Sequence, residues 1–184
     1  MTSDRAARGW RLCAGLLAAA AVAGCAATNP ASGEREYLDE QTAATVTVGA
    51  PALVFAHERA DLAVHARDYL TLVPLDVNRS GAHAQYFLGY VWSTIDKRTL
   101  ADQPQSLPRI EVIADGRRIP LSTHAGSLRE LGLGEVPVPS PARSATLLIA
   151  PASREEQAFI ADATEVRAVL LHDGATERFE LWSR

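Results

Sequence analysis

The side chains best suited to chemistry in this sequence are its 2 cysteines and 5 histidines. Histidine binds metals or transfers protons, and a metal held on one helix face needs two histidines four residues apart. No pair has that spacing among His57, His65, His83, His124 and His172. We therefore expect scattered surface or loop histidines and no metal. A metal site assembled from distant strands is the alternative, because exported proteins meet zinc and copper.

Motifs of the common catalytic sites are absent from the sequence. It has no G-x-S-x-G, no H-E-x-x-H, no P-loop and no dinucleotide-binding fingerprint. The stretch LGLGE at 131–135 has two glycines but lacks the strand-to-helix setting of a phosphate site. A pair of carboxylates across a cleft would serve a glycosidase, although a sequence does not reveal a cleft. We expect no enzymatic activity and no cofactor.

Cys25 ends a segment that has the features of a secretory signal. Arg5, Arg8 and Arg11 precede an apolar run over 12–22. A helix rises about 1.5 Å per residue, so this run covers roughly half of a ~30 Å hydrocarbon core. The basic start, the short apolar run and the small residues at its end predict a signal peptide rather than a membrane span.

The last residues of this segment, Val22-Ala23-Gly24-Cys25, resemble the lipobox of bacterial lipoprotein signal peptides. The resemblance implies removal of residues 1–24 and a diacylglyceryl group on the Cys25 thiol, with acylation of the new amino terminus. Two or more acyl chains hold a protein stably on a membrane. Ala26, where Asp favours inner-membrane retention in enterobacteria, implies an outer-membrane anchor that faces the periplasm.

The chain from residue 25 onward would contain neither a free thiol nor a disulfide. Cys13 lies in the removed segment and Cys25 carries the lipid. Of 18 basic and 22 acidic side chains, residues 1–24 hold three arginines and one aspartate, which leaves 15 and 21 and a net charge of −6. This charge disfavours nucleic acid as a partner. The expected partners are the membrane, through Cys25, and an envelope protein.

Composition divides the rest of the chain into a tether and one domain. Residues 25–36 are small and polar without periodicity, which predicts a flexible tether. Glu34, Glu36, Asp39 and Glu40 cluster at its end, and we interpret them as a solvated acidic patch, with a docking surface for a basic partner as the alternative. Residues 37–184 show eight or nine short strands between turns.

These patterns predict a mainly β protein, an antiparallel β-sandwich that resembles an immunoglobulin arrangement, with one or two short helices. Pro74 predicts an edge or bulge in the strand over 68–77. Asp115-Gly116 and Asp173-Gly174 predict hairpins. Ser153 and Glu156 form a capping box that predicts a helix of about ten residues over 154–163.

Aromatic residues are the candidate contact residues of the domain. Tyr86, Tyr90 and Trp92 share one face of a strand over 84–94, and that strand is expected to be central because both its faces are apolar. These rings would stack on a sugar or peptide if exposed, and we favour the alternative that they belong to the core. Trp182 falls on the polar face of the last strand and is expected to be exposed.

Three functional hypotheses follow from these observations. The favoured one is a lipid-anchored interaction or accessory module of the cell envelope without catalytic activity. The second is a periplasmic lipoprotein that binds a small ligand, a glycan or a metal. The third is an envelope hydrolase. A flat exposed apolar surface without a pocket would favour the first. An exposed aromatic row or a histidine cluster would favour the second. A deep polar pocket with a perturbed carboxylate or histidine would favour the third.

Overall fold

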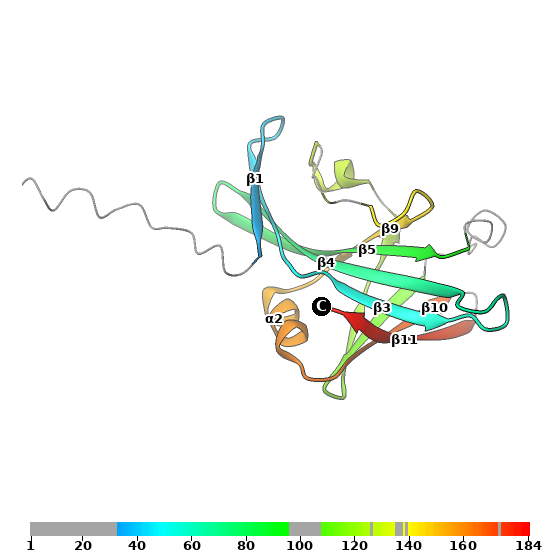
Figure 1. The fold of residues 1–184 in the computed structure, drawn as a ribbon. Helices are drawn as coiled ribbons and strands as arrows, with labels where there is room; N and C mark the ends of the chain where they lie inside the picture. Colours follow the sequence, from blue (N-terminus) through cyan, green and yellow to red (C-terminus); the bar gives the residue numbers. More distant parts are fainter. Residues whose placement is uncertain (1–32, 96–107, 126, 135–137, 139, 173) are drawn as a thin grey trace, which may run out of the picture. The chain divides into compact units, whose positions relative to one another are not determined.

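A computed structural model of the protein describes residues 33–95, 108–125, 127–134, 138, 140–172 and 174–184. These residues belong to one compact unit, Ser32–Arg184. Figure 1 shows its elements, which are β1 Arg35–Asp39, β2 Ala44–Val48, β3 Leu53–Glu58, β4 Arg67–Arg79, β5 Ala82–Ser93, β6 Arg109–Ala114, β7 Arg117–Leu121, β8 His124–Ala125, the 3-10 helix η2 Leu128–Leu131, β9 Thr146–Pro151, α2 Arg154–Asp162, β10 Val166–His172 and β11 Ala175–Ser183. Strand β1 begins two residues before the predicted start of the domain. Among the described residues, no helix is long and apolar enough to cross a membrane.

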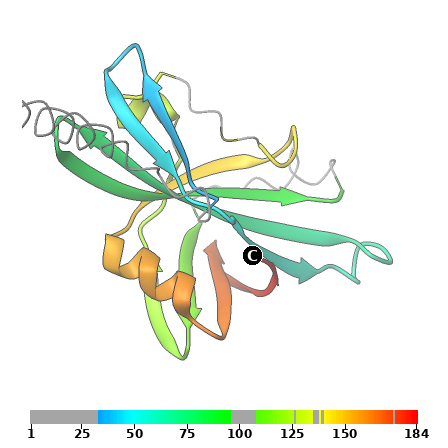
Figure 2. The same cartoon turned by 60° about the vertical axis from the view of Figure 1, so that its left-hand side comes forward.

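The strands form one antiparallel sheet, which confirms the mainly β class. The hydrogen-bonded order is β7-β6-β10-β11-β3-β4-β5-β9-β8, and β2 joins β1 to β4. The first and last strands of this order, β7 and β8, are linked by only Ser122 and Thr123. The two ends of the sheet therefore lie close together in space, so the sheet is curled, and Figures 1 and 2 show its strands bending.

This arrangement differs from the predicted sandwich because the described strands are not divided between two separate sheets. The long strand β4 explains the difference, since it belongs to both halves of the structure. It pairs with β3 through Arg67–Leu72 and with β2 through Leu75–Asn78. Along its other side it pairs with β5 over its whole length. One strand of 13 residues thus keeps the hydrogen-bonded ladder continuous where a sandwich would break it.

Pro74 lies at the point where the neighbour of β4 changes. The prediction of an edge strand is wrong, because β4 has partners on both sides. Pro74 has no N–H to donate, and it falls between the last residue paired with β3 and the first paired with β2. Its carbonyl oxygen accepts a hydrogen bond from the N–H of Gly49, 2.8 Å away. The sheet thus tolerates a proline in a central strand by placing it in a gap between two neighbours.

The sheet is apolar on both faces. Its inner face encloses the larger core, which includes Leu72, Phe87, Ile110, Leu148 and Phe179. The outer face of β4 and β5 carries a second cluster with Val73, Leu75, Leu88 and Tyr90. Leu133, 2 % exposed, covers this second cluster from the segment that follows η2. Leu133 of the LGLGE stretch therefore contributes to the core.

Asp39 ties this covering segment to the β1–β2 hairpin. Its carboxylate accepts hydrogen bonds from the N–H of Gly134 at 2.7 Å, the N–H of Gln41 at 3.1 Å and the hydroxyl of Thr42 at 2.8 Å. The N–H of Gly134 is the main reason that the pKa of Asp39 lies below its usual value. The prediction of a solvated acidic patch is wrong for Asp39, because this carboxylate is buried and satisfied by local amides.

Helix α2 and the predicted capping box are confirmed. The Ser153 hydroxyl accepts from the N–H of Glu156 at 3.2 Å, and the Glu156 carboxylate accepts from the N–H of Ser153 at 2.8 Å. Ile160 of α2 is fully buried in the inner core. The helix packs against β6 (Figures 1 and 2). At its other end, the Arg184 guanidinium donates to the carbonyl oxygen of Ala163, 2.8 Å away.

Candidate functional site

A group of aromatic side chains lies on the outer face of the sheet, and we call Trp92, Tyr69 and Trp182 the aromatic row. Trp182 is exposed, and Tyr69 and Trp92 are half-buried. Strand alternation places these side chains on that face. On β4, Tyr69 and Thr71 alternate with Leu70 and Leu72, which lie in the inner core. On β11, Trp182 follows Leu181, which packs against the same core. The inner core therefore fixes the opposite side chains on the outer face.

The three rings of the aromatic row contact one another through Tyr69. Tyr69 and Trp92 are paired across β4 and β5, and their rings stack with centroids 4.2 Å apart and planes 14° apart. Tyr69 meets Trp182 edge to face, with centroids 6.4 Å apart and planes at 84°. The indole N–H of Trp92 donates to the hydroxyl of Thr71 at 3.4 Å. The edge-to-face contact of Tyr69 with Trp182 is an arrangement that aromatic quadrupoles favour.

Arg67 adds a positive charge to the row. Its guanidinium carbon lies 4.7 Å from the centre of the Trp182 ring, which is the geometry of a cation–π contact. It also pairs with the Glu58 carboxylate at 3.2 Å. The hydrogen bond to Glu58 is the main cause that raises the pKa of Arg67. The cation over Trp182 is therefore held in place from the neighbouring strand.

The four predicted contact residues differ in how far their side chains are exposed. Trp182 is 57 % exposed, as predicted. Trp92 is half-buried and reaches Trp182 through Tyr69. Tyr90 is 6 % exposed and belongs to the second cluster, and this burial raises the pKa of its hydroxyl, so it is a core residue and not a contact residue. Tyr86 is half-buried beside the same cluster, and its carbonyl oxygen accepts from the side chain of Gln157.

Neither Tyr69 of the aromatic row nor Arg67 beside it was identified from the sequence. The signal for Tyr69 is present. The turn at Ser80 and Gly81 pairs Arg79 with Ala82, and counting back along both strands places Tyr69 opposite Trp92. Arg67 has no such signal, because its position over Trp182 depends on the pairing of β3 with β11, which are far apart in the sequence.

A separate charged cluster joins the β3–β4 connection to β11. The Arg59 guanidinium pairs with Asp61 and Asp68, each at 2.9 Å, and lies 3.7 Å from Glu177. The imidazole of His172 lies 3.6 Å from the Glu177 carboxylate. The hydrogen bond to Asp61 is the largest cause that raises the pKa of Arg59. Because Arg59 bridges carboxylates from different elements, we interpret this cluster as structural.

The histidines are dispersed, as predicted. His57 Nδ1 lies 2.8 Å from the carbonyl oxygen of Arg178, and His83 Nδ1 lies 2.9 Å from the Asp76 carboxylate. In the described part of the chain, no three His, Cys, Asp or Glu side chains gather closely enough to hold a metal ion. Cys25, the predicted lipidation site, lies outside the described residues, as do the signal peptide and most of the predicted tether.

The aromatic row thus carries chemical groups that can bind a ligand or a partner. Its flat rings and single cation offer stacking, apolar contact and one charge-assisted hydrogen bond. Comparison with known proteins gives no relative from which a ligand follows, since no protein family, curated protein or solved structure matches this chain.

Proposed function

We propose that this protein is a lipid-anchored interaction module of a bacterial envelope, without catalytic activity, that binds an envelope protein through the aromatic row. The observation that carries the proposal is the exposure of Trp182, 57 %, on the outer face of the sheet beside two further rings and a cation. Tryptophan, tyrosine and arginine are the residues that most often dominate binding energy at protein interfaces.

The surroundings of the row support this proposal. At one end of β4 and β5 the outer face is covered by Leu133 and its neighbours. At the other end the same face continues as Tyr69 and Trp92, which the described residues leave half-buried. A partner that covers Trp182 would extend the buried apolar surface already present at the other end, and burial of apolar area favours association by about 25 cal/mol per Å².

A glycan ligand, the second hypothesis, is supported less well by the same rings. Sugar binding by stacking uses an open ring face. Tyr69 and Trp92 cover one face of each other, and Arg67 lies over the ring of Trp182. A protein partner, which contacts ring edges, the cation and the adjoining strands together, fits this arrangement better. The lipid anchor at Cys25 and the periplasmic face of the outer membrane remain part of the proposal and follow from the lipobox and from Ala26.

Crosslinking in intact cells tests the proposal. A photoreactive amino acid is introduced at Glu180, which is exposed on β11 two residues before Trp182, and for comparison at the exposed Arg118 on β7. We expect one discrete adduct from position 180, none from position 118, and loss of the adduct when Trp182→Ala is added. An adduct that persists in the Trp182→Ala background would contradict the proposed contact surface.

A further inference from the structure

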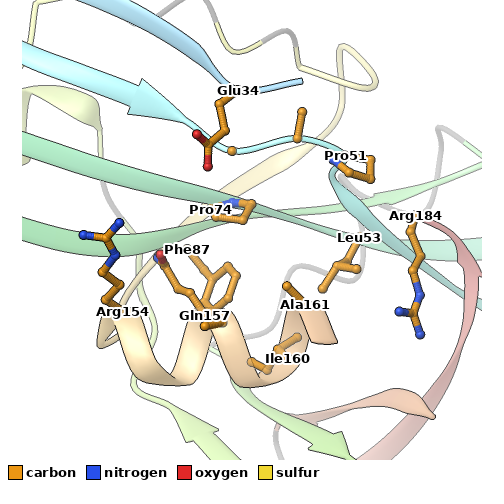
Figure 3. A pocket seen from close by; sticks show the side chains of 13 residues that line it. Glu34, Pro51, Leu53, Pro74, Phe87, Arg154, Gln157, Ile160, Ala161 and Arg184 are labelled. Carbon is orange, nitrogen blue, oxygen red and sulfur yellow. The ribbon is translucent and has the colours of Figure 1, made fainter. Parts of the chain in front are cut away.

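A cavity of about 330 Å³ lies between α2 and the connection from β2 to β3. The apolar floor of the cavity has accessible surface from Pro51, Pro74, Ala158 and Ala161. The buried side chains of Leu53, Phe87 and Ile160, each at most 6 % exposed, belong to the packed layer next to it. Figure 3 shows Pro74 of β4 on the strand side of the cavity and Ala161 on the helix α2. The exposed residues Ala158 and Ala161 also line it, so the cavity is reached from solvent along the surface of α2.

Charged side chains lie around this apolar floor. Figure 3 shows Arg154 and Arg184 at opposite ends of the cavity, with Phe87 between them and Glu34 on the side opposite α2. The Arg184 guanidinium donates to the carbonyl oxygens of Ala163 and Thr164, so it is committed to the end of α2. None of the ion pairs among the residues that the structure describes involves Arg154. The cation available to a ligand is therefore Arg154.

We propose that this cavity binds a single-chain amphiphile with a carboxylate head, such as a medium-chain fatty acid. The apolar tail lies along Pro51, Pro74 and Ala161, and the carboxylate pairs with Arg154. A guanidinium offers two parallel N–H donors that match a carboxylate. The cavity is at the small end of the range for ligand sites, about 300–1,000 Å³, which suits one chain and not a diacyl lipid or a protein segment.

The sign of the charges makes the proposal specific. Arg154 and Arg184 outnumber Glu34, so the cavity has a net positive rim. An uncharged chain of the same length gains the floor contacts but not the pairing with Arg154. This site is separate from the aromatic row, none of whose residues line the cavity, and it does not rest on the proposed function.

Photolabelling of the full chain in membranes tests this proposal. The probe is a laurate analogue with a diazirine at the end of its chain, and labelled peptides are mapped by mass spectrometry. We expect labelling within residues 154–162 that excess laurate suppresses and that excess dodecanol suppresses much less. Suppression by dodecanol equal to that by laurate would overturn the carboxylate assignment, and absence of labelling there would overturn the site.

Matched variants separate binding from folding. Arg154→Gln should lower labelling by about five-fold, the effect of one exposed charge-assisted contact, whereas Arg143→Gln, an exposed arginine outside the cavity, should not. Ala158→Trp should block the cavity, whereas Glu155→Trp on the same helix should not. Equal labelling of all four variants would refute the proposal. Labelling that appears only when Cys25→Ala removes the lipid would also refute it, because the occupant would then be the acyl chain of the protein itself.

Discussion

Replacement of Ser153 by Ala should destabilise the domain through a single helix cap. Ser153 and Glu156 exchange two hydrogen bonds at the start of α2, at 3.2 and 2.8 Å. Alanine removes the hydroxyl that accepts from the N–H of Glu156, and this N–H has no partner further back in the helix. Loss of such a cap typically costs about 1 kcal/mol in the free energy of unfolding. In a domain of this size that change corresponds to a fall in Tm of about 2–4 °C.

The assay is thermal unfolding followed by circular dichroism, with two comparisons. Ser153→Asp should retain the stability, because aspartate also caps and its charge is favourable at a helix N-terminus. Ser140→Ala is the matched control, since the Ser140 hydroxyl donates to the carbonyl oxygen of Ala142 in an exposed loop. We expect a change within about 0.5 kcal/mol for this control. If Ser153→Ala is silent, or if Ser153→Asp is worse than alanine, the capping argument fails.

Three further predictions concern the core, the carboxylates and the anchor. A methyl group on Gly89 would lie 3.5 Å from Ile110, Leu148 and Leu72, ordinary contact distances, so Gly89→Ala should fold normally while Gly89→Val should cost about 1–3 kcal/mol in urea unfolding. Backbone N–H groups, mainly those of Gly134 and Glu165, lower the pKa of Asp39 and Asp115. The two carboxylates therefore stabilise the domain fully above about pH 4, and this stabilisation is lost as the pH falls through the lowered pKa values. Asp39→Asn should therefore make the Tm depend less on pH between pH 5 and pH 3. Cys25→Ala should leave an unprocessed precursor without lipid, and a mature membrane-bound species in cell fractionation would show that the lipobox prediction is wrong.

Local structure was predictable because its signals lie close together in the sequence. Asp115 and Gly116 both have positive φ, 46° and 82°, as a two-residue hairpin turn requires, and β6 and β7 pair around them. The capping box needs only Ser153 and Glu156 and was equally readable. The alternation of β5 correctly indicated a central strand, since both of its faces pack against apolar clusters.

The curl of the sheet was not predictable, because it depends on pairs that are distant in the sequence. Strand β3 pairs with β11 and β6 pairs with β10, and neither pair is joined by a short turn. A run of alternating strands fits a sandwich as well as one curled sheet. The deciding feature is the sharing of β4 between two neighbours at Pro74, and a proline by itself suggests an edge more strongly than a change of partner.

The arrangement around Trp182 suggests why a small domain would keep a large ring in solvent. Tyr69 meets the ring at its edge and Arg67 lies over its face, while Glu58 holds the guanidinium of Arg67. These contacts restrict the indole before any partner arrives, so less side-chain entropy is lost when the interface forms. A tryptophan has only two rotatable side-chain bonds, which keeps that loss small from the start. A ring that is exposed yet held in this way has the properties of a binding residue, whereas a ring that had merely failed to reach the core would have no reason to carry a positioned cation.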